Sequence, residues 1–543
     1  MRILNVALSF CLAVSGLGLS FLRPATLSTC PTPLQTLINN AANNDTLYLP
    51  ACNYTESVTI DKNLALIGVT SGGTTLLQAP ANQRIITLTG DHTLNLQYLT
   101  LTGGSPDDGN AGGAILANDG SLQISHSHIS NNSASNGGAI YQGKAAGSVY
   151  LTSDVFENNH ATNGQGGAIY ANGNVVSADS TFNGNSASSH GGAITVWSGS
   201  TTITGGSFTG NAAAGNGGAV NLNNGLSVSG VTFTSNTSAD SGGAITQWNA
   251  GFTILIASSN FHSNKAVNKG GGVYVNSVVA LNQDWFDSNS VDSFTTDDTY
   301  GGGVYAGNTG NVTATPAVTI ENSRFTGNAT HCNSGCYSKG GGIYIENSLG
   351  GATPTLTVVS NVVFDSNFSW DGGGLYANYG QVNADHLTFT NNQAGYGAGM
   401  SPYILNGEAL LFKGNQAEDQ GGGVRGFNLS IKQSTFLDNT AKYAGGSALF
   451  AGSIANLTNL LMAHNTESGT GYGTVYLGGN STGVLNNVTF AQPTLGTGTA
   501  VYLGTGANYH IFNTIIANYV YCYDLFGTLY EDHVLYSLSL IHI

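Results

Sequence analysis

The chain has 543 residues, a formal net charge of −16 and 77 glycines, and only 8% of its residues are charged. Its thirteen Lys and Arg residues form no basic stripe, so nucleic acid is not an expected partner, because phosphate neutralisation supplies most of that affinity. Beyond the N-terminus no apolar run is long enough to span a bilayer, so we expect no membrane insertion by the rest of the chain. Hydrophobic residues make up 41% and recur regularly, which favours a short-period β array.

Residues 1–25 are predicted to be a secretory signal peptide. Arg2 is followed by an apolar run, Ile3 to Leu22, that contains small residues. An N-terminal membrane anchor is the alternative. A signal peptide implies that the protein is secreted or lies on the outer cell surface.

Cysteine positions agree with an oxidising compartment. We expect two disulfides, Cys30 with Cys52 and Cys332 with Cys336, which leaves Cys522 unpaired. A zinc site at His331, Cys332 and Cys336 would need a fourth ligand that the neighbouring sequence does not supply.

Residues 26–111 are predicted to form an N-terminal cap and the first coils of a solenoid, each coil being one turn of the chain around the long axis. A short helix is expected from Leu34 to Ala42, followed by a strand at 45–49. An uncapped solenoid would expose its core and its strand edges, so a helix at this end has a physical purpose.

Residues 112–518 contain two interleaved motifs. Phe-x-x-Asn begins at Phe156, Phe182, Phe208, Phe233, Phe261, Phe286, Phe325, Phe364, Phe389, Phe412 and Phe436. Gly-Gly-Ala or Gly-Gly-Gly, followed by an aliphatic residue, begins at Gly112, Gly137, Gly166, Gly191, Gly217, Gly242, Gly270, Gly301, Gly340, Gly372 and Gly421. Most steps are 23 to 28 residues, which is the length of one coil of stacked short strands. Residues 519–543 are predicted to be either an irregular tail or a truncated further coil.

Each motif predicts a structural role. The Phe should point inward and stack on its neighbours, and the Asn should form a ladder of side-chain amides between coils. The glycine pair supplies positive φ and close backbone approach at a corner. About seventeen layers spaced ~4.8 Å apart predict a rod on the order of 80 Å long.

The paired Gly-Gly-Ala-Ile and Phe-x-x-Asn tetrapeptides resemble the repeats of the chlamydial polymorphic outer membrane proteins, and more broadly the pectin-lyase-like β-helices. The resemblance covers roughly residues 112 to 518. It implies an all-β, single-stranded, right-handed parallel β-helix with a short N-terminal capping helix. It also implies surface display and attachment, since those relatives are adhesins.

Two neighbouring coils carry longer turns. From Asn289 to Gly301, and from Asn328 to Gly340, the turn spans 12 residues instead of five to seven. Coils that stack in register would place these insertions side by side, where binding is usually found on a solenoid. Unselected loop length is the alternative.

The candidates for catalysis are Asp297 and Asp298, because glycoside hydrolysis requires two carboxyls. They lie in a Thr-rich loop without a neighbouring Arg or Lys in the sequence, so solvated loop residues are the favoured interpretation. No cofactor or metal is predicted, although Ca²⁺ bound by Asp and Asn in a turn stays open.

The candidates for binding are tyrosines that follow the glycine motif. Tyr274, Tyr305, Tyr344 and Tyr376 come from four successive coils, and alternation places them outside the core. An exposed aromatic row could stack on sugar rings or contact a protein. Alternatively, these tyrosines only stabilise the sheet through cross-strand pairs.

The sequence therefore favours a secreted or surface-displayed, adhesin-like β-helix that attaches to a glycan or protein on a host or neighbouring cell. A polysaccharide lyase or glycoside hydrolase of pectin-lyase-like fold is one alternative. A structural spacer within a larger surface protein is the other.

Overall fold

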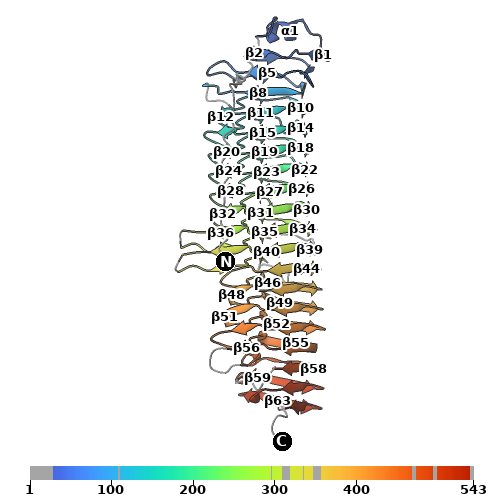
Figure 1. Ribbon diagram of the computed structural model, residues 1–543, viewed down its shortest axis with the longest axis vertical. Helices are drawn as coiled ribbons and strands as arrows, with labels where there is room; N and C mark the ends of the chain where they lie inside the picture. Colours follow the sequence, from blue (N-terminus) through green and yellow to red (C-terminus); the bar gives the residue numbers. More distant parts are fainter. Residues whose placement is uncertain are drawn as a thin grey trace, which may run out of the picture.

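The computed structural model describes residues 29–537, except 108–110, 295, 308–317, 334, 347–355, 468–472 and 493–497. The predicted signal peptide, residues 1–25, lies outside the described residues. The rest is a straight, nearly all-β parallel solenoid of about 17 turns with one helix at its N-terminal end (Figure 1). The predicted parallel β-solenoid with a capping helix is confirmed.

From β9 (Ile115–Ala117) to β59 (Thr499–Leu503) the first strand of each coil follows the glycine corner. The first strands pair in parallel with the same strand of the next coil. They are β3 (Val58–Ile60), β6 (Ile86–Leu88), β9 (Ile115–Ala117), β13 (Ile140–Gln142), β17 (Ile169–Ala171), β21 (Ile194–Val196), β25 (Val220–Leu222), β29 (Ile245–Gln247), β33 (Val273–Val275), β38 (Val304–Ala306), β43 (Ile343–Glu346), β46 (Leu375–Asp385), β49 (Met400–Glu408), β52 (Val424–Lys432), β55 (Leu449–Ala463), β57 (Val475–Leu477), β59 (Thr499–Leu503) and β62 (Tyr521–Leu525).

The second strand of each coil alternates buried and exposed residues. This column consists of β1 (Asp45–Tyr48), β4 (Leu64–Ile67), β7 (Thr93–Gln97), β10 (Ser121–Ser125), β14 (Ser148–Thr152), β18 (Asn174–Ala178), β22 (Thr201–Thr204), β26 (Leu226–Ser229), β30 (Thr253–Ala257), β34 (Val278–Asn282), β39 (Val318–Glu321), β44 (Leu356–Ser360), β58 (Thr482–Ala491), β60 (Asn508–Phe512) and β63 (Thr528–Asp532). In β46, β49, β52 and β55 the first and second strands are continuous.

The third strand carries the Phe motif. It comprises β2 (Asn53–Thr55), β5 (Thr75–Gln78), β8 (Leu99–Thr102), β11 (His128–Ser130), β15 (Val155–Glu157), β19 (Thr181–Asn183), β23 (Ser207–Thr209), β27 (Thr232–Thr234), β31 (Asn260–His262), β35 (Trp285–Asp287), β40 (Arg324–Thr326), β45 (Val363–Asp365), β47 (Thr388–Thr390), β50 (Leu411–Lys413), β53 (Thr435–Leu437), β61 (Ile515–Ala517) and β64 (Leu535–Ser537).

Short strands after the ladder Asn close the coil before the glycine corner. They are β12 (Ser133–Ala134), β16 (His160–Ala161), β20 (Ser186–Ala187), β24 (Ala212–Ala213), β28 (Thr237–Ser238), β32 (Lys265–Ala266), β36 (Ser290–Asp292), β41 (Ala329–His331), β48 (Gln393–Tyr396), β51 (Gln416–Gln420), β54 (Thr440–Ala441) and β56 (Thr466–Glu467). In the two long turns β37 (Thr299–Tyr300) and β42 (Ser338–Lys339) pair just before the corner.

The motif phenylalanines form one continuous stack inside the shaft. From Phe156 to Phe436 the rings of successive coils lie 4.6 to 5.0 Å apart and within 14° of parallel. Each of these side chains is fully buried. The predicted Phe stack is confirmed.

The motif asparagines form the predicted ladder of amides. Asn185 donates from Nδ2 to the carbonyl of Phe156 and to Oδ1 of Asn211, both at 3.0 Å. Its own Oδ1 accepts from the backbone N–H and the Nδ2 of Asn159. All the amide's hydrogen-bonding capacity is used, which lets a polar group lie at zero exposure. The buried ladder comprises Asn132, Asn159, Asn185, Asn211, Asn236, Asn264, Asn289, Asn328, Asn367, Asn392, Asn415, Asn439 and Asn465.

The glycine corner works as predicted. The first glycine of each pair has positive φ, for example 65° at Gly191. The second allows close approach, since a Cβ on Gly192 would lie 2.0 Å from the carbonyl oxygen of Gly218 in the next coil. Any side chain there would push the coils apart.

Helix α1 (Leu34–Asn40) covers the N-terminal end of the core with the buried side chains of Leu34 and Ile38. The Glu56 carboxylate accepts the N–H groups of Leu34 and Gln35, so it satisfies two donors at the helix N-terminus. A disulfide joins Cys30 to Cys52 beside it. At the other end β62, β63 and β64 form one more coil within the segment 519–543, whose last six residues lie outside the described part.

Two aspartates lie in a buried column that also contains several serines. Asp154 Oδ1 accepts the N–H of Ser127, as Asp284 Oδ1 accepts that of Ser259. At the same column position Ser259 and Ser434 accept a backbone N–H with their hydroxyls. Burial raises the pKa of Asp154 and of Asp284 to about 7, although the backbone hydrogen bonds to each carboxylate lower it.

We predict that Asn185→Ala lowers the free energy of unfolding by about 2–4 kcal/mol, because the buried N–H of Asn159 and carbonyl of Phe156 in the preceding coil lose their side-chain partner and the ladder is broken. Urea unfolding followed by circular dichroism measures this. Asn183→Ala, at the exposed end of β19 two residues before Asn185, is the control and should change stability by less than about 0.5 kcal/mol. Equal effects would contradict a structural ladder.

The pKa values of Asp154 and Asp284 predict that stability falls as pH rises. Both folded-state pKa values lie above the unfolded value of about 3.9. The stability that the two aspartates contribute is therefore fully present below about pH 4 and is lost as the pH rises through 7. The double variant Asp154→Ser, Asp284→Ser should flatten this slope in urea unfolding between pH 4 and 8. The exposed Asp179→Ser serves as the control; an unchanged slope in the double variant would refute the assignment.

Candidate functional site

The four tyrosines predicted to form an exposed row do form a stacked column. In the order Tyr274, Tyr305, Tyr344, Tyr376, the ring centroids lie 4.9, 5.2 and 5.4 Å apart. The predicted exposure was wrong for the first three, which are 6%, 3% and 2% exposed, and Tyr376 is half-buried. They lie outside the main core, as alternation requires, but they pack in a cluster of their own.

A second column of side chains covers these tyrosines. It consists of the residues just before the glycine corner, which pair from coil to coil: Lys269, Tyr300, Lys339, Asp371, Tyr396 and Gln420. Because the corner itself has no side chains, the two columns meet across it. The Lys269 ammonium lies 5.0 Å from the Tyr305 ring centroid and the Lys339 ammonium 5.5 Å from that of Tyr376, within cation–π range.

Burial keeps these phenols protonated. It raises the pKa of Tyr274 to about 12 and raises the pKa values of Tyr305 and Tyr344 further, with help from the Glu346 carboxylate. The Tyr344 hydroxyl donates to Glu346. These tyrosines therefore act as packed, neutral side chains, and only Tyr376 borders an open surface.

The two long turns lie side by side and project from the shaft beside β36 (Figure 1). Their bases are tied by Asp292, which contacts both Lys265 and His331 at 2.9 Å. The hydrogen bond from His331, the largest effect, holds the pKa of Asp292 well below its usual range, and the hydrogen bond from Lys265 lowers it further.

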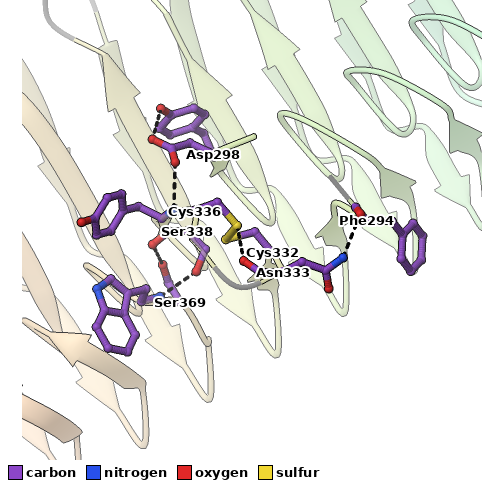
Figure 2. The surroundings of a disulfide bond; sticks show 10 residues. Phe294, Asp298, Cys332, Asn333, Cys336, Ser338 and Ser369 are labelled. Carbon is purple, nitrogen blue, oxygen red and sulfur yellow. Dashed lines mark hydrogen bonds between the residues drawn. A yellow bond between two sulfur atoms is a disulfide. The ribbon is translucent and has the colours of Figure 1, made fainter. Parts of the chain in front are cut away.

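Asp298 links the two long turns (Figure 2). Its Oδ1 accepts the backbone N–H of Tyr337 at 2.8 Å and its Oδ2 accepts the hydroxyl of Tyr300 at 3.0 Å. Asn333 donates to the carbonyl of Phe294 at 2.8 Å, and a Cys332–Cys336 disulfide closes the second turn. Oδ1 of Asp298 thus joins the two turns and Oδ2 braces its own turn, whereas Asp297 is exposed.

Exposed aromatic rings gather on this part of the shaft. Phe294 is 76% exposed and Tyr337 57%, both on the long turns, with Phe368 at 41% and Trp370 at 42% on the next coil. The backbone N–H of Trp370 donates to the Ser338 hydroxyl at 2.9 Å, which ties this coil to the second long turn. A shallow pocket of about 450 Å³ begins at Phe368 and Trp370 and continues to Glu418 and Lys442.

A second row of exposed rings lies across the glycine corner, on the continuous strands β46, β49 and β52. Tyr379, Tyr403 and Phe427 are 43%, 38% and 43% exposed. The Tyr403 and Phe427 rings stack at 5.1 Å and 4°, whereas Tyr379 is tilted by 55° against Tyr403. This row forms one wall of a pocket of about 320 Å³.

The tyrosine column forms the opposite wall of this pocket, and it is interrupted there. After Tyr376 the column continues as Ser401, Arg425 and Phe450. The Arg425 guanidinium reaches back over the Ser401 layer to Asp371, at 3.7 Å, and stacks on Tyr396 at 4.9 Å from the ring centroid. Burial raises the pKa of Asp371 to about 6, although Arg425 lowers it.

Sequence reasoning missed Asp371 and Arg425. The signal was available in the repeat, since Asp371 occupies the position of Lys269 and Lys339, and Arg425 that of the tyrosines. Within the described residues no group of three or more His, Cys, Asp and Glu side chains could hold a metal ion, and no helix there is long and apolar enough to cross a membrane.

Two family descriptions match the chain, and no curated protein matches it. The Chlamydia polymorphic membrane protein repeat matches residues 127–142, 155–172, 179–196 and 230–246. The right-handed β-helix region matches residues 285–489, which hold the long turns and both aromatic surfaces. The chain is therefore a right-handed β-solenoid that carries repeats of the Chlamydia polymorphic membrane protein type.

Proposed function

We propose that this protein is a surface-displayed or secreted, adhesin-like β-helix that attaches through the aromatic face of residues 292–452. The observation that carries the proposal is the gathering of exposed aromatic rings on and beside the fixed long turns in this stretch of the shaft. Phe294 and Tyr337 stand out from turns held by Asp298 and Asp292. Large aromatic side chains on a rigid support supply much of the binding energy at protein interfaces.

The family repeats support the same function. Their printed name refers to a membrane protein of Chlamydia, which agrees with a location at the outer surface. The expected partner is a glycan or protein on a host or neighbouring cell. Nucleic acid is disfavoured by the net charge of −16.

The aromatic face predicts that attachment depends on the tips of the long turns. The double variant Phe294→Ser, Tyr337→Ser should weaken binding of the labelled full chain to intact cells by about tenfold or more, because two exposed anchors are lost. Flow cytometry over a protein concentration series, on animal epithelial cells and on bacteria, measures the apparent affinity.

The control is Tyr150→Ser, Trp197→Ser, which removes two exposed rings from coils outside the face. It should bind as the parent does. Equal losses in both variants would indicate nonspecific adsorption. Binding by neither variant nor parent would favour a structural spacer.

A polysaccharide-active enzyme is the second candidate, favoured by one observation. Asp371 is a largely buried carboxyl behind Arg425, which lines an open pocket, and burial raises the pKa of Asp371 to about 6, a value suited to a proton donor. If the enzyme hypothesis holds, the full chain will release new reducing ends or unsaturated sugars from neutral or acidic polysaccharides, with or without Ca²⁺.

Asp371→Asn should then abolish turnover, and an Asp297→Asn, Asp298→Asn variant tests the carboxyls of the long turn. Activity lost only in Asp371→Asn would replace the adhesin proposal with catalysis at the pocket. No turnover on any substrate leaves attachment as the function.

A further inference from the structure

The interrupted tyrosine column produces a groove of defined shape. Tyr376 is covered by Tyr344 on one side, but on the other side the next layer holds only the small side chain of Ser401. Two layers on, Arg425 fills part of this gap by reaching back to Asp371. The remaining space opens towards the row of exposed rings as a groove of about 320 Å³.

The groove has two chemically different walls and a narrow floor. Its outer wall is aromatic and consists of Tyr379, Tyr403 and Phe427. Its inner wall is polar around Ser401 and Arg425. The floor between them is formed by small or compact residues of successive coils, Ala377, Pro402 and Gly426. A ligand in the groove would therefore meet rings on one side and hydrogen-bonding groups on the other.

Sugar residues have the matching chemistry. Their C–H faces pack against aromatic rings, and their hydroxyls exchange hydrogen bonds with guanidinium, hydroxyl and amide groups. The tilted Tyr379 ring does not stack face to face on Tyr403, so part of its face stays available. Asn378 adds an amide at the rim, where it also donates to Glu346 at 3.0 Å.

Charge decides which sugars fit. Arg425 is the only charged residue that lines the groove, and Asp371 lies 3.7 Å behind it, so the pair leaves little net charge. The chain as a whole carries −16, which repels uronates and sulfated glycans at low salt. The volume of about 320 Å³ is near the lower end of the range of about 300–1,000 Å³ for small-ligand sites.

We propose that the groove between Tyr376–Ser401–Arg425 and Tyr379–Tyr403–Phe427 binds one or two sugar rings of a neutral oligosaccharide. This rests on the proposed function and names the class of ligand that the attachment face recognises. Arg425 binds the hydroxyls, and the three exposed rings pack against the sugar.

Two variants with opposite chemistry test the groove. Tyr403→Ser removes a ring from the outer wall, whereas Ser401→Tyr adds the missing ring and fills the space. Isothermal titration of the full chain with neutral tetrasaccharides of glucose, N-acetylglucosamine, galactose and mannose should find at least one ligand. Both variants should weaken that ligand's binding tenfold or more. If rings acted only as a sticky surface, Ser401→Tyr would bind at least as well as the parent.

The controls are matched to each variant. Tyr150→Ser removes a ring of similar exposure elsewhere on the shaft, and Leu116→Tyr adds a tyrosine in the same column next to Tyr141. Both should bind as the parent does. Thermal unfolding by circular dichroism checks that every variant keeps the parent's fold, and Phe427→Ser replaces any variant that does not.

Several outcomes would overturn the proposal. These are no binding of any neutral tetrasaccharide, tighter binding of oligogalacturonate or a sulfated oligosaccharide, or full binding by Ser401→Tyr. A further result would be that the chain binds cells, that Tyr403→Ser abolishes this cell binding, and that free tetrasaccharides do not compete with it. The groove would then bind a protein, so the sugar assignment would fail and the proposed attachment would stand. If tetrasaccharides bind but cells do not, attachment fails and the sugar site stands.

Discussion

The buried asparagine ladder is the constraint on which the rest of this structure depends. A polar amide without partners inside a β-helix would cost more than it contributes, so each rung must meet the rungs above and below. Asn185 does this with four hydrogen bonds that join three successive coils. A slip of one residue in any coil would break these bonds and would also remove a Phe from the internal stack.

Because the register between coils is fixed, residues at the same position in successive repeats form columns on the outer surface. A residue at a given place in the repeat always lies above and below its counterparts, so a tyrosine in successive repeats becomes a stack, as at Tyr274 and Tyr305. The glycine corner then brings two such columns together, because it contributes no side chains of its own. This explains why lysines and tyrosines that are five residues apart in the repeat cover one another.

Because of the same register, one residue that departs from the repeat can create a binding site. Ser401 lacks the ring of Tyr376 in the layer before it, and in a stack this leaves a space one layer high. Arg425 can reach Asp371 only across that space. Long turns act in the same way, since two insertions at one repeat position lie side by side and hold each other through Asp298 and Asp292.

The sequence by itself determined the parallel solenoid, the inward Phe stack, the Asn ladder, the glycine corner and the paired long turns. These follow from local periodicity, which depends only on residues within one coil and its copies. It also placed Tyr274, Tyr305 and Tyr344 outside the core, but not their burial, because the side chains that cover them come from across the corner of neighbouring coils.

Only the tertiary structure decided that Arg425 meets Asp371 two coils earlier, that Asp298 holds the long turns, and that an open groove remains beside Tyr403. These contacts depend on the length and direction of individual side chains between coils, and repeat patterns carry no information about either.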